Sequence, residues 1–313
     1  MTERQLKTPV VLTIFNRPDS TKKVFEAIRQ AKPPKLLIIA DAPRADRPNE
    51  EEKCVAARAV VEQIDWDCEV LKNYSLVNLG PIKRIASGLD WVFNTVEEAI
   101  ILEHDCVPDI TFFRFCEELL KYYRHDERVM SICGQNIQFG GRRTEYSYYF
   151  SRYYHSWGWA TWKRAWQYYD LQMKLWPEVR DKGLLKDILG DSRAVKYWTR
   201  FFQASYAEQL KSWDYQWTFA CWIQNGLTIL PDRNLVSNIG FVPDAVNTTD
   251  VDSQYASMPV ESMSFPLKHP PFIIRNVAAD NFTQNTAFDP PLLTRLRGKV
   301  NRAVGKKTIN IIS

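Results

Sequence analysis

The first 140 residues of the chain alternate between short apolar runs and amphipathic segments. Apolar runs rich in β-branched residues predict buried strands, and segments with apolar side chains on one helical face predict the helices between them. The predicted strands cover residues 10–15, 36–40, 69–72, 99–102 and 129–133. The predicted helices are one that begins at an Asp19 or Ser20 cap and ends before Pro33, and three at residues 50–64, 81–95 and 110–124.

Strands and helices that alternate at this spacing are typical of right-handed crossovers and of a mostly parallel sheet. Such a sheet is covered by helices on both faces, so we predict an α/β fold of this kind. Ligands of these folds bind outside the carboxyl ends of the strands. Arg17 follows the first predicted strand, Asp41 the second, and Glu103 and Asp105 the fourth. We therefore expect these four side chains to line one crevice.

The pattern changes after residue 140. Residues 146–170 are rich in aromatic side chains and alternate poorly, and helical patterns follow at 184–189 and 195–210. We therefore divide the chain into a first half at 1–140 and a second, mixed half at 141–270.

A C-terminal extension follows at 271–313, and its last residues are basic. This tail is either solvated or a weakly amphipathic helix that contacts a membrane surface or an acidic partner.

The composition is that of an ordinary soluble globular chain, with 45% hydrophobic and 25% charged residues among 313. A net charge of +4 is too small to predict a nucleic acid partner. The N-terminus has no apolar signal-like stretch, and no run of apolar residues is long enough to span a membrane. We expect a cytoplasmic protein, free or held at a membrane surface by its tail.

Phosphate-binding loops rich in glycine are absent from the sequence. No G-x-x-x-x-G-K-S/T occurs and no G-x-G-x-x-G follows the first strand, which argues against Walker NTPases and Rossmann-type dehydrogenases. The stretch Glu103-His104-Asp105 offers another route, because a carboxylate can hold Mg²⁺ or Mn²⁺ and the metal can hold phosphate. Alternation along an extended backbone predicts that His104 packs away from the site. The alternative for this stretch is a solvated turn.

Seven blocks of the sequence resemble, in order, the GT-A fold nucleotide-sugar glycosyltransferases. The blocks read FNRPD, IIADAP, NLGPIKRIASGLDWVF, EHDCVPD, SWGWATWKRAW, WDYQW and NLVSNIGF. The EHD stretch is similar to the D-x-D-type motif of those enzymes. The version with Glu first resembles bacterial hemolytic-protein-like glycosyltransferases and the Golgi α-mannoside β-1,2-N-acetylglucosaminyltransferases. The resemblance implies a Rossmann-like fold with a nucleotide-sugar-binding half at 1–140 and an acceptor-side, catalytic half at 141–270.

The resemblance also implies roles for residues of the first half. Asp105 would ligate Mn²⁺ or Mg²⁺, and Glu103 would hold the ribose or the waters of the metal. Arg17 would contact the nucleotide, and Asp41 would accept hydrogen bonds from the base. The alternatives are structural: Arg17 caps the end of a strand, and Asp41 shapes a turn.

Two basic residues open the helix predicted at 81–95, namely Lys83 and Arg84. The resemblance implies that they lie over the donor. The alternative is a solvated first turn, although positive charge there opposes the helix dipole.

In the second half the resemblance assigns the catalytic base to Asp214, for which the alternative is a helix cap. Trp157, Gly158 and Trp159 would form a wall of the sugar or acceptor pocket, because aromatic faces stack on sugar rings. The alternative for these three is packing in the core. Gly158 between two tryptophans predicts a loop where the backbone approaches a neighbour closely.

A loop in the second half departs from the bacterial relatives. Asp244 belongs to it and would help position it, unless it only shapes a turn. Asn247 stands where those relatives tend to carry histidine, which would weaken the metal site or change its ion preference.

Together these features predict a metal-dependent inverting glycosyltransferase of bacterial glycan synthesis. It would move a sugar from a nucleotide-diphosphate donor to a glycan, a lipid-linked sugar or another hydroxyl acceptor. A UDP-sugar is favoured, because a carboxylate at Asp41 can accept from the N3–H of uracil. The alternative is a non-catalytic carbohydrate- or nucleotide-binding protein of the same fold. A nucleotidyltransferase is disfavoured, because the first strand lacks a glycine-rich loop.

Overall fold

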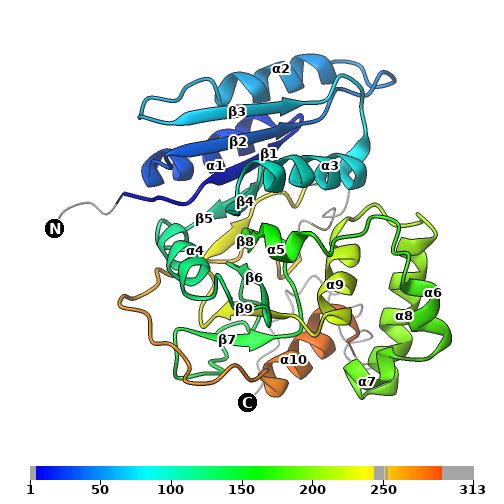
Figure 1. Cartoon of the computed structure of the whole chain (residues 1–313). Helices are drawn as coiled ribbons and strands as arrows, with labels where there is room; N and C mark the ends of the chain where they lie inside the picture. The colour runs from blue at the N-terminus through cyan, green and yellow to red at the C-terminus, as the bar shows by residue number, and fades with distance from the viewer. Residues whose placement is uncertain (1–4, 243–249, 251–252, 291–313) are drawn as a thin grey trace, which may run out of the picture.

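The computed structural model describes residues 5–242, 250 and 253–290, and one large sheet runs through this part of the chain (Figure 1). The strands of the sheet are β1 (Val10–Ile14), β2 (Lys35–Ala40), β3 (Glu69–Tyr74), β4 (Glu98–Glu103), β6 (Val129–Cys133), β7 (Tyr148–Ser151), β8 (Trp159–Trp162) and β9 (Leu227–Pro231). They lie in the order β3-β2-β1-β4-β8-β6-β9-β7. The pairs β1–β2, β1–β4, β2–β3 and β6–β9 are parallel, and the other three are antiparallel.

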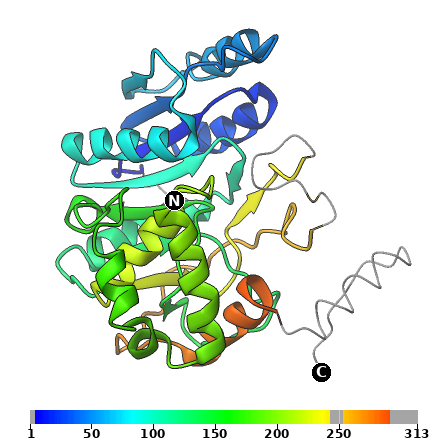
Figure 2. The same ribbon diagram turned by 90° about the vertical axis from the view of Figure 1, so that its right-hand side faces the viewer.

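Helices cover both faces of this sheet. They are α1 (Pro18–Ala31), α2 (Glu50–Val60), α3 (Gly80–Thr95), α4 (Thr111–Tyr122), α5 (Lys163–Trp166), α6 (Trp176–Asp181), α7 (Leu185–Leu189), α8 (Ser192–Tyr206), α9 (Asp214–Ile223) and α10 (Val277–Thr283), followed by a π-helical turn at Gln284–Phe288. In Figure 2 the green helices α6 to α8 face the viewer, below the cyan α3. The predicted α/β fold with a mostly parallel sheet is therefore confirmed.

The alternation of side chains along β1 separates the two faces of the core. Leu12 belongs to the cluster formed with α1, α2 and α4, whereas Val11 belongs to the cluster formed with α3, α6, α8 and α9. Both side chains are fully buried. Burial on both faces explains why β1 and β2 are almost entirely apolar, whereas β3, at the edge of the sheet, is partly exposed and carries polar residues.

A second, two-stranded sheet was not predicted. In it β5 (Cys106–Pro108) pairs antiparallel with β10 (Val236–Asn238). Because β5 follows β4 after only two residues, the pairing brings the chain after Asn238 next to Asp105. The amide of Ile239 donates to the Asp105 carbonyl at 2.9 Å.

Two helix ends differ from the prediction. α1 begins at Pro18, and its cap position is Arg17 with no side-chain cap bond, so neither Asp19 nor Ser20 caps it. The Ser20 hydroxyl instead donates to the Arg17 carbonyl at 3.3 Å. α2 ends at Val60 rather than at 64, because the next amides donate three residues back, as that of Val61 does to Arg58.

Strands from both sides of residue 140 share the large sheet, and β8 lies between β4 and β6. Within the described residues, every helix is too short or too polar to cross a bilayer.

Candidate active site

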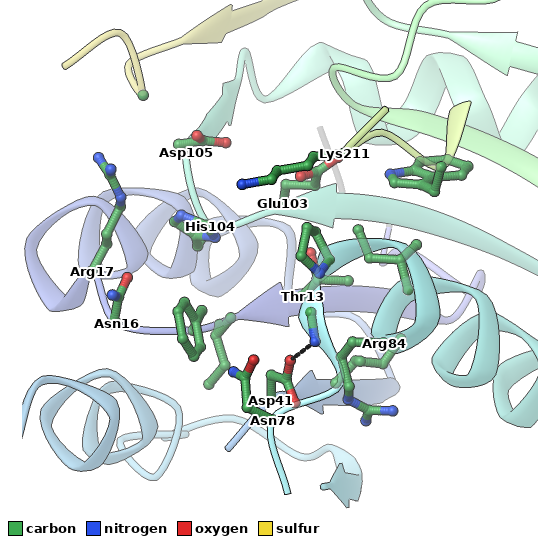
Figure 3. Close-up of a pocket in the computed structure, with 18 of the residues that line it drawn as sticks. Thr13, Asn16, Arg17, Asp41, Asn78, Arg84, Glu103, His104, Asp105 and Lys211 are labelled. Carbon is green, nitrogen blue, oxygen red and sulfur yellow. Dashed lines mark hydrogen bonds between the residues drawn. The ribbon is translucent and has the colours of Figure 1, made fainter. Parts of the chain in front are cut away.

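A pocket of about 810 Å³ opens at the carboxyl ends of β1, β2 and β4 (Figure 3). Asn16 and Arg17 line it after β1, Asp41 after β2, and Glu103 and Asp105 at the end of β4. The four side chains expected in one crevice therefore lie in the same pocket. Their convergence follows from the parallel pairing of β1 with β2 and β4.

The second half of the chain supplies the opposite wall. Trp157 comes from the loop before β8, Lys211 from the loop before α9, and Asp214 is the first residue of α9. Asn238 ends β10, and Gly240 follows it. Figure 3 shows Lys211 pointing into the pocket. The pocket is therefore enclosed between segments that are at least fifty residues apart in sequence.

Three carboxylates from the two walls interact through the pocket. Burial raises the pKa of Glu103 to about 8, and the charges of Asp105 and Asp214 add to this effect. Burial also raises the pKa of Asp214, and its Oδ1 accepts a hydrogen bond from the Ser212 hydroxyl. Such a cluster favours a bound cation or a shared proton.

His104 lines the pocket and does not pack away from it as predicted. The reason is local, because β4 ends at Glu103 and the next two residues form a turn, so strand alternation stops there. Burial lowers the pKa of His104, with Asp105 opposing and Arg17 reinforcing the shift. A neutral imidazole therefore faces the pocket at neutral pH.

Asp41 is buried and caps helix α3. Its Oδ1 accepts from the amides of Ala42 at 2.9 Å and Leu79 at 3.0 Å, and its Oδ2 accepts from that of Gly80 at 2.9 Å. A carboxylate at this position also complements the positive end of the helix dipole. Most of its acceptor capacity is thus used by the backbone.

Arg84 lines the pocket, and its side chain forms hydrogen bonds to both β2 and β3. Its guanidinium donates to the Ala40 carbonyl at 3.0 Å and to the Asn73 carbonyl at 2.5 Å and side-chain oxygen at 2.6 Å. Lys83 lines a separate, smaller pocket of about 340 Å³ with Asp90 and Asp170. The helix that opens with both residues therefore presents them in different directions.

The aromatic segment before β8 divides between the pocket and the core. Trp157 lines the pocket, whereas Trp159 is fully buried in β8. Gly158 has φ +63°, and a Cβ there would lie 2.7 Å from Val236 Cγ2. The close approach expected at this glycine is thus to a core side chain of β10. Asp244 and Asn247, from the sequence prediction, lie outside the described residues.

Several pocket residues were missed in the sequence. Lys211 is only three positions before Asp214 and Gly240 falls within the NLVSNIGF block, so proximity to those motifs was the available signal. Arg44 and Glu50 also line the pocket and form an ion pair. No pattern in the sequence pairs these two, because the loop between them has no regular period.

The carboxylates of the pocket fit a divalent cation only with help from a ligand. The described residues contain no group of three or more His, Cys, Asp or Glu side chains that could hold a metal ion. Within the part of the chain that the structure describes, the Asp105 carboxylate accepts one hydrogen bond, from the Cys106 thiol, with 3.6 Å between Sγ and Oδ1. Mg²⁺ and Mn²⁺ at nucleotide sites take one or two carboxylates, and phosphates and water supply the other ligands. An Asp105 oxygen without a donor suits that chemistry.

No protein-family model and no curated protein matches the sequence. Among solved structures, the chain is similar to a mannosyltransferase from Pyrobaculum calidifontis in complex with GDP-mannose and Mn²⁺, with 13% identity, a TM-score of 0.35, and coverage of 50% of this chain and 45% of that one. It is also similar to UDP-glucose pyrophosphorylase complexed with UDP-glucose, with 10% identity, a TM-score of 0.28, and coverage of 48% of this chain and 65% of that one. A third similar structure is HddC from Yersinia pseudotuberculosis, with 9% identity, a TM-score of 0.31, and coverage of 50% of this chain and 77% of that one. The chain thus spans under half of the mannosyltransferase's length.

Proposed function

We propose that this protein is a metal-dependent, inverting glycosyltransferase that uses a nucleotide-diphosphate sugar. The observation that carries the proposal is the meeting of Glu103, Asp105 and Asp214 in one pocket at the carboxyl ends of a parallel sheet. Glu103 ends β4, Asp105 lies in the turn that follows β4, and Asp214 comes from the opposite wall. A transferase that displaces a leaving group needs charge compensation on one side and a base on the other.

In this proposal Asp105, assisted by Glu103, holds Mn²⁺ or Mg²⁺, which supplies positive charge to the leaving diphosphate when bound. Arg17 lies in the same wall and contacts the donor near its nucleotide. The Asp41 carboxylate, which also caps α3, accepts from the N3–H of uracil, so the site favours a uridine nucleotide. Arg84 bonds to the ends of β2 and β3 and so acts on the donor by holding the start of α3 in place. Lys83 lines the smaller pocket, and this proposal gives it no contact with the donor.

The reaction is a single displacement at the anomeric carbon. The acceptor hydroxyl forms the new bond, the bond to the diphosphate oxygen breaks with its electron pair, and the hydroxyl proton passes to Asp214. A carboxylate with a raised pKa is a better base near neutral pH than an ordinary one. Attack from the face opposite the leaving group inverts the anomeric configuration.

The acceptor is a glycan, a lipid-linked sugar or another hydroxyl compound. Trp157, edge-on to Phe241 with ring centres 5.5 Å apart, offers an aromatic surface for its ring. The basic residues of the segment 292–313 would supply any contact with a membrane surface.

Replacing Asp214 with asparagine tests the proposal, because asparagine keeps the size of the side chain and removes the base. Donor binding should stay within about twofold of wild type, and transfer should fall by roughly 10²–10⁴-fold. Asp187→Asn is the matched control, since Asp187 also lies in the first turn of a helix but is exposed and outside the pocket.

The product should carry the inverted anomeric configuration, measured by NMR. Transfer at the wild-type rate by Asp214→Asn, or a product with retained configuration, would contradict the mechanism. Donor binding by the wild type without transfer to any acceptor would instead support the non-catalytic binding protein.

A further inference from the structure

The carboxylate of Asp105 lies against a position that only glycine leaves open. A Cβ built on Gly240 would lie 1.9 Å from Asp105 Oδ2, 2.7 Å from its Cγ and 3.0 Å from its Cβ. Carbon atoms do not approach that closely, so any larger residue at 240 must displace the carboxylate. Gly88 is also crowded, but there the neighbour is the core side chain of Ile39.

Backbone conformation does not explain this glycine. The glycines with positive φ are Gly80, Gly140, Gly158, Gly183 and Gly190, and Gly240 is not among them. Gly240 is therefore not in the left-handed region that favours glycine. The space taken by the Asp105 carboxylate is therefore the reason that a side chain does not fit.

The segment that carries Gly240 is anchored and cannot easily retreat. The Gly240 amide donates to Asn238 Oδ1 at 2.7 Å, and the amide of Ile239 donates to the Asp105 carbonyl at 2.9 Å. The Asn238 carbonyl in turn accepts from the amide of Ser257 at 2.9 Å. The pairing of β10 with β5 holds the same segment from the other side.

The opposite side of the carboxylate is also occupied. The Cys106 thiol donates to Asp105 Oδ1 at 3.6 Å, and Asn238 Nδ2 lies 4.0 Å from the Cys106 sulfur. The carboxylate thus lies between the thiol of the next residue and the backbone of Gly240. Contacts on two sides restrict its rotamer, which is how neighbouring groups orient a metal ligand.

We infer that Gly240 is a positioning residue for Asp105. Because Gly240 has no side chain, the Asp105 carboxylate can face the pocket. The inference rests on the proposed metal-dependent function. The two nearest atoms that a Cβ at 240 would meet, Asp105 Oδ2 and Cγ, belong to the carboxyl group, so rotation of that side chain can relieve the severe part of the clash. The Asp105 Cβ does not move with this rotation, and at 3.0 Å it needs to give by only a few tenths of an ångström. The cost of Gly240→Ala therefore falls on the site and not on the fold.

The test compares UDP binding by calorimetry in Mn²⁺ and in EDTA for wild type, Gly240→Ala, Asp105→Ala and the double variant. Gly240→Ala should weaken UDP binding in Mn²⁺ by about tenfold or more and leave it unchanged in EDTA. Its urea unfolding should match that of wild type. Gly141→Ala is the control, because Gly141 is exposed, has no positive φ and lies outside the pocket.

In the Asp105→Ala background the same change at 240 should have no further effect on binding, since Oδ2 and Cγ, the two atoms closer than 3.0 Å, are gone. An equal loss in both backgrounds, or no loss in wild type, overturns the inference. If Gly240→Ala does not fold, the double variant should fold, and its failure would also overturn it. If Asp105→Ala binds UDP in Mn²⁺ as wild type does, the proposed metal site itself fails. That outcome differs from the one in which Gly240→Ala binds UDP in Mn²⁺ as wild type does and Asp105→Ala does not, where only the inference on Gly240 fails.

Discussion

Replacing Asp41 with alanine tests what the pocket carboxylate that accepts from three backbone amides does. The change removes the acceptor for the amides of Ala42, Leu79 and Gly80 and the negative charge at the start of α3. Loss of a helix cap costs about 0.5–2 kcal/mol, and loss of the favourable dipole interaction adds about 0.3–1 kcal/mol. Water in the pocket can satisfy part of the exposed backbone, so we expect a total of about 2 kcal/mol.

This loss should appear without any ligand, as a lower midpoint of urea unfolding followed by circular dichroism. Asp41→Asn should lose about half as much, because the amide oxygen still accepts. Asp46→Ala is the control, since Asp46 lies exposed on the same loop. Unfolding of Asp41→Ala within about 0.3 kcal/mol of the control would refute the capping argument. The proposed preference for uridine is tested separately, and equal binding of UDP and CDP by wild type would count against it.

Two further predictions concern charges in the pocket. The hydrogen-bonded Arg44 guanidinium lowers the pKa of Glu50 from 4.5 to about 2, so this pair stabilises the fold above pH 4.5 and loses its effect as the pH falls toward 2. Glu50→Gln should cost about 1–2 kcal/mol of unfolding free energy at pH 7, and a difference that does not shrink in acid would contradict this. Lys211→Met should slow transfer about tenfold, equivalent to about 1.4 kcal/mol, and Lys211→Arg should stay largely active. Lys186→Met is the control, because Lys186 is exposed. A transfer rate of Lys211→Met equal to that of the control would exclude a role for Lys211.

Most of the first half of the fold was predictable because β1, β2, β4 and β6 are buried on both faces. Continuous apolar runs such as residues 36–40 can be read directly, and parallel crossovers then place Arg17, Asp41 and Asp105 at one edge. The second half was harder to predict. β7 and β8 lie in an aromatic stretch without alternation, and β5 and β10 have three residues each, too few for a periodic signal.

The partners of the site residues could not be predicted for a different reason. Asp41 bonds to amides 38 and 39 residues away, and Arg84 bonds to the ends of two strands. Gly240 meets Asp105 across 135 residues of sequence. Such contacts depend on how α3 and β10 dock, and a single sequence carries no local pattern for docking.

The most direct test of the central claim is a thermal-shift measurement on the wild type with UDP-, GDP-, CMP- and dTDP-sugars, each in Mn²⁺ and in EDTA. Binding to the folded state raises stability by about 2.7 kcal/mol at a ligand concentration of 100 times the dissociation constant. The proposal predicts that a diphosphate donor, UDP-linked first, raises the melting temperature in Mn²⁺, and that the shift is lost in EDTA and in Asp105→Ala. Absence of a shift with every donor, or an equal shift in EDTA, would contradict it.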